Sequence, residues 1–279
     1  MSSLLSRVKA RLAREHGFTL VELLASMAAG MVVLGGLVTV ISVALQQTTY
    51  TFTRVDATER ARSMLAHAED ELHSACLVNG ATPIQGGAGN TQASDSSNLV
   101  FISQFGTSAS PTPVEHRITY NVAAGTLTEY TYTATTGGSD PTKWTFSSTP
   151  TNANGRLLLN HVSQIVSGSA IPVFQYFSYE PYTDQNGNPA MMLMDGTATV
   201  PGTTNLPNPD PLAVPLTTAS SSAPSVAEVM VNLLVGAQGG TLENTRLSSA
   251  SDPVTDSIVL RFTPPANAAG GTATFGPCA

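Results

Sequence analysis

One acidic residue, Glu22, stands at the start of an apolar stretch that is long enough to cross a lipid bilayer. No Asp, Glu, Lys or Arg occurs between Leu23 and Thr53, whereas a membrane-spanning helix needs only about 20 apolar residues. A carboxylate near the bilayer centre costs roughly 2.5 to 3.5 kcal/mol on insertion scales, so it is normally kept for a function such as pairing with an opposite charge. Glu22 is therefore the first candidate for functional chemistry, and its partner has to be identified.

The two cysteines, Cys76 and Cys278, are the next candidates, and both follow the apolar stretch. If this part of the chain lies outside the cytoplasmic membrane, it lies where disulfides persist. A bridge would close a loop of about 200 residues and, in the chain-entropy model, would stabilise the fold by about 5 kcal/mol. Two separate thiols are the alternative.

Two groups of side chains could bind a cation. Asp184, Asn186 and Asn188 present oxygen atoms at alternate positions, as calcium loops do, but Asn-Gly is also a strong hairpin-turn dipeptide. His67 and Glu71 lie four residues apart on a predicted helix and could hold a metal, although a solvated, salt-bridging pair is the simpler interpretation. We expect no bound metal and no cofactor.

The sequence contains no common catalytic motif. There is no Gly-x-Ser-x-Gly elbow, no His-Glu-x-x-His helix and no Walker glycine-lysine sequence. The glycine-rich segment Gly86-Gly87-Ala88-Gly89 lacks the strand-to-helix setting of a phosphate loop. We therefore expect no enzymatic activity.

Basic residues are concentrated before the apolar stretch. Four of them precede Gly17 together with a single acid, Glu15: Arg7, Lys9, Arg11 and Arg14. Their excess predicts that the N-terminus stays in the cytoplasm and that everything after the helix lies outside. Beyond Gly17 the chain has 8 basic and 18 acidic residues, a net charge of −10, and no basic patch, so nucleic-acid binding is not expected.

The position of Gly17 differs from that of a secretory cleavage site. An ordinary signal peptide has its small-residue site after the apolar region, whereas Gly17 precedes it. Cleavage at Gly17 would leave the anchor on the mature chain.

A ten-residue segment behind the basic leader resembles the class III leader of type IV prepilins and type II secretion pseudopilins: Gly17-Phe18-Thr19-Leu20-Val21-Glu22-Leu23-Leu24-Ala25-Ser26. The resemblance implies that a prepilin peptidase cleaves after Gly17 and methylates the new N-terminal residue, Phe18. It also implies that Glu22, as the fifth mature residue, pairs with the free amine of a neighbouring subunit. An uncleaved signal anchor is the alternative.

Glu22 and His67 should both lie on one N-terminal helix from Phe18 to about Val78, which would be ~90 Å long at 1.5 Å per residue. Residues 18–45 should form its transmembrane half and residues 46–80 its amphipathic half, with Asn79-Gly80 as the stop. The predicted buried face follows steps of three, four or seven residues: Val55, Arg62, Leu65, Ala68, Leu72 and Cys76.

Three glycines, Gly30, Gly35 and Gly36, interrupt the apolar half of this helix. Small residues allow helices to pack closely in a membrane; the resemblance to pilins implies instead that the helix loosens on assembly. Many major pilins carry a proline in this segment, and this sequence has none there.

Residues 81–279 should form a β-rich head with a Pro-, Ser- and Thr-rich insertion at 200–224. Ala123-Ala124-Gly125 should make a hairpin, and 156–166 a short helix or strand. Strands are expected at 99–102, 116–122, 126–133, 143–146, 172–177, 226–235 and 256–262. The predicted fold class is α+β and pilin-like, a long helix packed on a mostly antiparallel sheet.

The spacing of the blocks at 118–120, 126–128, 162–179, 226–235 and 257–261 resembles that of PilW-type minor pilins and GspJ-type pseudopilins. This implies a minor pilin of a type IV pilus, stored in inner-membrane lipid and incorporated with other pilin subunits by an inner-membrane assembly platform. A pseudopilin of a type II secretion system, which would end in a periplasmic pseudopilus rather than an extracellular pilus, is the second hypothesis. A membrane-anchored surface adhesin or binding protein is the third.

Overall fold

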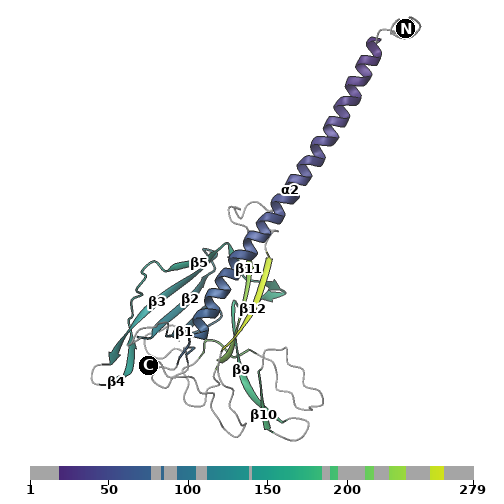
Figure 1. Cartoon of the computed structure of the whole chain (residues 1–279). Helices are drawn as coiled ribbons and strands as arrows, with labels where there is room; N and C mark the ends of the chain where they lie inside the picture. The colour runs from purple at the N-terminus through teal and green to yellow at the C-terminus, as the bar shows by residue number, and fades with distance from the viewer. Residues whose placement is uncertain are drawn as a thin grey trace, which may run out of the picture. The chain divides into compact units, whose positions relative to one another are not determined.

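The computed structural model describes residues 19–76, 83–84, 93–104, 112–137, 140–183, 189–193, 211–216, 226–236 and 252–260. The chain divides into two compact units, Met1–Phe52 and Thr53–Ala279. One helix, α2 (Leu20–His73), contributes to both units (Figure 1).

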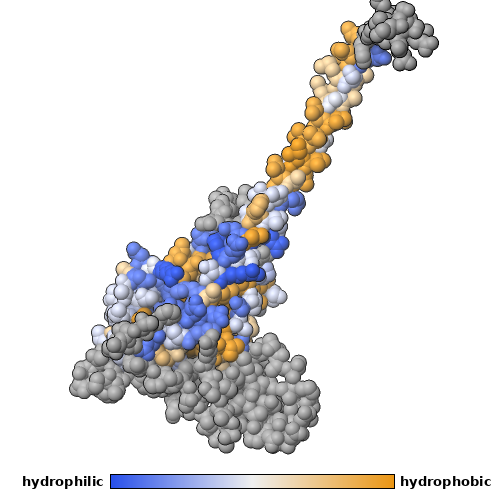
Figure 2. Space-filling model, viewed as in Figure 1, coloured by the Kyte–Doolittle hydropathy of each residue, from blue (hydrophilic) through white to orange (hydrophobic). Residues whose placement is uncertain are grey.

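In the first unit, α2 is apolar on all of its sides. The stretch that is apolar enough to span a membrane is 0% buried, and Figure 2 shows apolar side chains along this part of the helix. The hydroxyls of Thr39, Thr48 and Thr49 donate hydrogen bonds of 2.7 to 3.0 Å to carbonyls three or four residues earlier. Because these polar groups are satisfied within the helix, this segment suits a water-free environment.

In the second unit, α2 buries one face against the strands. The buried residues follow steps of three and four: Ala57, Ala61, Met64, Leu65, Ala68 and Leu72. The predictions for Val55 and Arg62 were wrong, because Val55 is 49% exposed and Arg62 is exposed as well. Each residue turns an α-helix by about 100°, so Arg62 points well away from the face on which Ala61 lies.

The helix ends at His73, earlier than the predicted stop at Asn79-Gly80, which lies outside the described residues. The last turn tightens, because the amides of Ser74 and Ala75 donate to the carbonyls of Glu71 and Leu72, each at 3.1 Å. Ala75 then forms a β-bridge with Ser103. Cys76 is buried, as predicted, but it follows the helix instead of belonging to it.

The first sheet has the strand order β1-β2-β3-β4, and β5 pairs with β3. Its members are β1 (Asn98–Ser103), β2 (Val114–Asn121), β3 (Thr126–Gly137), β4 (Asp140–Phe146) and β5 (Arg156–Asn160). All pairs are antiparallel. The turn between β2 and β3 closes through a 2.8 Å bond from the Gly125 amide to the Asn121 carbonyl, and Gly125 has a φ of 59°, which glycine adopts readily.

The second sheet has the strand order β10-β9-β11-β12, and β6 pairs with β11. Its members are β6 (Val162–Ser163), β9 (Phe174–Thr183), β10 (Pro189–Leu193), β11 (Val226–Val235) and β12 (Asp252–Val259). A separate two-stranded ribbon joins β7 (Val166–Ser167) to β8 (Ser169–Ala170). The central strand β11 is buried along most of its length, as expected for a strand with pairing partners on both sides and elements packed on its faces.

One core joins the second half of α2 to both sheets. It includes helix residues such as Leu72, first-sheet residues such as Phe101 and second-sheet residues such as Tyr176, all almost completely buried. Figure 1 shows the helix running alongside the strands of this unit. The predicted fold class is confirmed: one long N-terminal helix followed by antiparallel sheets in an α+β, pilin-like architecture.

Candidate functional site

Glu22 forms a reciprocal cap with Thr19 at the first turn of α2. The Glu22 amide donates to Thr19 Oγ1 at 3.3 Å. In return, the amide and hydroxyl of Thr19 donate to Glu22 Oε2 at 3.2 and 3.1 Å. This is a capping box, in which the side chains of the first and fourth residues satisfy backbone donors that the helix leaves unpaired.

The cap gives the carboxylate a local function besides any intermolecular one. A negative charge at a helix N-terminus is also favoured by the helix dipole. Only Oε2 is used by Thr19, and Oε1 makes no hydrogen bond to any residue that the structure describes. Sequence analysis missed this cap, although the spacing Thr19-x-x-Glu22 before an apolar run is its usual signature.

Gly17 and Phe18, the predicted cleavage and methylation sites, lie outside the described residues. The calcium candidates Asp184, Asn186 and Asn188 also lie outside them. The predictions for these five residues therefore stay predictions. Thr19 is the first described residue, and its carbonyl accepts the first helical bond from the Leu23 amide at 3.1 Å.

A second group of polar side chains lies where α2 meets the first sheet. His67 and Glu71 come from the helix, His116 from β2 and Glu129 from β3. His67 Nε2 lies 3.0 Å from Glu129 Oε2, and His116 Nδ1 lies 2.8 Å from Glu129 Oε1. His116 Nε2 is 3.5 Å from Glu71 Oε2. We call these four residues the His–Glu cluster.

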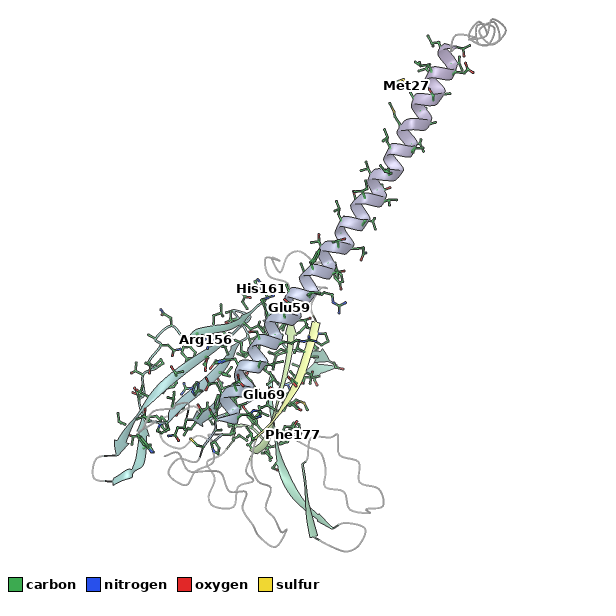
Figure 3. The ribbon with its side chains drawn as sticks, viewed as in Figure 1. Met27, Glu59, Glu69, Arg156, His161 and Phe177 are labelled. Carbon is green, nitrogen blue, oxygen red and sulfur yellow. The ribbon has the colours of Figure 1, made fainter. Side chains whose placement is uncertain are left out.

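Arg156, which Figure 3 labels on β5, adds a cation beside the cluster. Its NH1 atom is 3.2 Å from His67 Nε2 and 3.9 Å from Glu129 Oε2. The Arg156 side chain is 62% exposed, whereas that of Glu129 is 3% exposed. Solvent is thus excluded around Glu129, whereas the cluster is open to solvent beside Arg156.

Glu129 keeps its charge in this surrounding. Burial alone would raise the pKa of its carboxyl, but hydrogen bonds with His116 and His67 more than offset this and lower the pKa below its ordinary value. His116 is held in place by stacking on Phe101, with ring centroids 5.1 Å apart. The sequence had indicated His67 and Glu71 as a solvated pair; the structure adds two residues from the sheet to them.

A buried carboxylate on β2, Glu115, was also missed by sequence analysis. It is 1% exposed, and its nearest cation is Arg117, at 3.7 Å between Oε1 and NH2. Burial raises the pKa of Glu115 to about 7, although Arg117 and His116 act in the opposite direction. The Arg117 guanidinium lies 4.7 Å from the centre of the Tyr132 ring, a cation–π distance.

Cys76 packs beside Ile102, with Trp144 and Phe146 against them. It is disulfide-bonded in the structure, and no described cysteine is a free thiol. Cys278, the second of the two cysteines in the chain, lies outside the described residues. The pairing of Cys76 with Cys278 therefore stays a prediction.

Comparison with known protein families finds one motif, near the N-terminus. The prokaryotic N-terminal methylation motif matches residues 12–38, a range that contains Gly17, Phe18, Thr19 and Glu22. No curated protein and no solved structure matches the chain significantly. The motif and the long apolar helix together point to a structural, pilin-like subunit that a prepilin peptidase processes and that assembles with other pilins. The N-terminal segment of this chain thus carries the N-terminal methylation motif, which supports a class III leader of the type IV prepilin and pseudopilin kind.

Proposed function

We propose that this chain is a minor pilin of PilW type, cleaved after Gly17, methylated on Phe18 and incorporated into a type IV pilus. The observation that supports this most directly is the setting of Glu22. A capped carboxylate begins an unburied apolar helix, within a motif for N-terminal methylation. The β-rich unit that follows contributes the head of the subunit.

Before assembly the subunit is stored in the cytoplasmic membrane with its N-terminus inside. The four basic residues before Gly17 support this orientation. Residues 18–45 lie in lipid in this proposal, residues 46–80 continue the helix toward the head, and residues 81–279 form the head outside the membrane. Removal of residues 1–17 leaves the anchor in place and creates a new amine on Phe18.

Assembly gives Glu22 an opposite charge that none of the described residues provides. Its Oε1 atom has no described hydrogen-bond partner, whereas Oε2 accepts two bonds from Thr19. The amine on Phe18 of a neighbouring subunit can approach Oε1 while the cap stays in place. Because two unpaired charges in hydrocarbon cost more than one ion pair, this contact selects the register between subunits.

The apolar half of α2 supplies the packing surface between subunits. Its large side chains are exposed, including Val32 at 75% and Val40 at 69%. A side-chain carbon added at Gly30, Gly35 or Gly36 would meet nothing within 4 Å in the chain itself. The space beside these glycines is therefore open to a neighbouring helix, which small residues allow to approach closely.

Measuring how much of two variants is incorporated into filaments separates the function of the Glu22 charge from its capping role. We expect Glu22→Ala to leave the chain in the membrane but to lower its amount in sheared filaments at least tenfold. The matched control is Thr19→Val, which removes the hydroxyl of the cap at a cost of about 1 kcal/mol and keeps the carboxylate. Its amount in filaments should stay within about twofold of wild type. Normal incorporation of Glu22→Ala, or equal losses in both variants, would refute the charge-pair role.

A pseudopilin of a type II secretion system is the second candidate, because the segment from Gly17 to Ser26 resembles the leaders of prepilins and pseudopilins alike. Deleting the gene and scoring surface pili against secreted exoproteins separates the two. Loss of pili with intact secretion supports the minor pilin; loss of secretion with intact pili supports the pseudopilin. Intact pili that no longer attach to surfaces would favour an adhesin.

A further inference from the structure

We propose that His67, Glu71 and Glu129 bind a divalent transition-metal ion, with zinc as the best match, and that this ion fastens the second half of α2 to the first sheet. This site is independent of the filament function proposed above. It lies within the second unit of the chain and uses none of the residues of the leader motif.

The three side chains offer a compact set of ligand atoms. One nitrogen of His67 and one carboxylate oxygen each from Glu71 and Glu129 lie within 4.8 Å of one another. Ligands about 2.0 to 2.2 Å from a common zinc ion are separated by roughly 3 to 4 Å, so small side-chain movements suffice. His67 and Glu71 stand four residues apart on α2 and therefore project from the same face of the helix.

The surrounding residues hold the two carboxylates as outer-shell partners do in metal sites. His116 Nδ1 bonds to Glu129 Oε1 at 2.8 Å and leaves Oε2 directed at His67. The Ser103 hydroxyl donates to Glu71 Oε2 at 3.3 Å. The side-chain amide of Asn152 donates from Nδ2 to the backbone carbonyl of Glu129 at 3.0 Å, which fixes the strand at this position.

His67 supplies an independent indication that a cation belongs here. Its Nε2 atom is 3.0 Å from Glu129 Oε2 and 3.2 Å from Arg156 NH1. An imidazole nitrogen of this kind either carries a proton and donates or is bare and accepts, so it cannot satisfy both neighbours. A metal ion bound to Nε2 and Oε2 in place of the Arg156 guanidinium removes the conflict, because both atoms then direct lone pairs at the same positive charge.

Arg156 occupies the side from which an ion would approach. Its side chain is 62% exposed and can move into solvent at little cost, whereas Glu129 is fixed in the interior. Arg156 therefore acts as a competing cation, and we expect its removal to strengthen metal binding. The mixed nitrogen and oxygen ligands favour zinc over calcium or magnesium, which prefer oxygen ligands.

The experiment uses the full chain in detergent micelles and titrates it with zinc chloride, with calcium chloride in parallel, by calorimetry and thermal unfolding. We expect one zinc ion per chain, a zinc-dependent rise in Tm and no comparable effect of calcium. Glu129→Gln and His67→Ala should each weaken zinc binding at least about tenfold, in the range found for altered metal sites. Arg156→Ala should bind zinc more tightly than wild type.

His73→Ala is the matched control, because His73 forms a similar helical pair with Glu69, at 3.9 Å, without being part of the three-residue ligand set. It should bind zinc as wild type does. If Glu129→Gln loses its circular-dichroism signature of folding, Glu71→Gln replaces it, since the Glu71 side chain is 15% exposed and less deeply buried. Absence of a zinc effect on wild type overturns the proposal, as does unchanged binding in the ligand variants or equal loss in His73→Ala.

Discussion

Glu115 is a buried carboxylate that couples the stability of the head to pH. Its pKa is raised to about 7 from a model-peptide value of 4.5, chiefly because burial disfavours the charged form. The folded state therefore binds more protons than the unfolded state between these two values, and stability falls as pH rises through this window. A pKa difference of one unit corresponds to about 1.36 kcal/mol. The free energy of unfolding that Glu115 removes over this pH window is therefore at most about 3 kcal/mol.

We predict that Glu115→Gln removes this part of the pH dependence. The variant should be more stable than wild type by about 1 to 3 kcal/mol at pH ~8 and gain little or nothing at pH ~4.5. Denaturant unfolding at both pH values measures the difference. Glu59→Gln is the control, because Glu59 is exposed on the same unit. If the free energy of unfolding changed with pH equally in Glu115→Gln and in wild type, the Glu115 carboxylate would not contribute to the pH dependence of stability.

The function of a single residue could be predicted where its neighbours in the sequence indicate it. It could not be predicted where the fold brings together residues that are distant in the sequence. Glu22 is conspicuous as one charge before an uncharged stretch, and its cap follows from Thr19 three residues earlier. The His–Glu cluster has no such signal. His116 and Glu129 become neighbours because β2 and β3 pair with Ile118 opposite Glu129, which makes His116 its diagonal neighbour on the same sheet face. No sequence pattern specifies that register together with the docking of the helix.

At the scale of elements, the buried face of α2 is set by small residues. Ala57 and Ala61 are 0% exposed, and their short side chains let the strands approach the helix closely. A pattern based on large apolar residues favours Val55 instead. For this reason the buried face predicted from the sequence included Val55, which is exposed. Strands were predicted better, because β11 is a continuous apolar run whose bounds, Val226–Val235, match the expected range. β10 and β8 were not predicted, since short strands carry little pattern.

We predict that Ala61→Leu destabilises the head by about 1 to 3 kcal/mol, because it adds volume to a packed interior. Arg62→Leu, one residue further along the helix on an exposed position, should change stability by no more than about 0.5 kcal/mol. Thermal or denaturant unfolding of the two variants compares them directly. A larger loss in Arg62→Leu than in Ala61→Leu would mean that the helix packs through the face that the sequence pattern first indicated.

At the scale of the whole molecule, a disulfide between Cys76 and Cys278 would tie the C-terminal end of the chain to the segment that follows α2. Cys76 is disulfide-bonded, and Cys278 is the other cysteine of the sequence. We predict that Cys76→Ser lowers the free energy of unfolding by up to about 5 kcal/mol, the value for a closed loop of about 200 residues.

Thiol titration of the denatured wild-type chain checks the same bridge without a substitution. It should detect no free thiol before reduction and two afterwards. Cys278→Ser should reproduce the stability loss of Cys76→Ser, and the double variant should lose no more than either single one. Two reactive thiols in the unreduced chain would contradict the bridge.

The proposed filament function requires that the N-terminal segment be converted into an end that can assemble. The N-terminal methylation motif at residues 12–38 contains Gly17 and Phe18 and supports a mature chain that begins at Phe18. The most direct measurement is mass spectrometry of the N-terminus after expression with and without a prepilin peptidase. With the peptidase, we expect a chain that begins at Phe18 and carries one additional methyl group on its amine; without it, the leader should remain. An intact leader in the presence of an active peptidase, or cleavage at another position, would contradict the account.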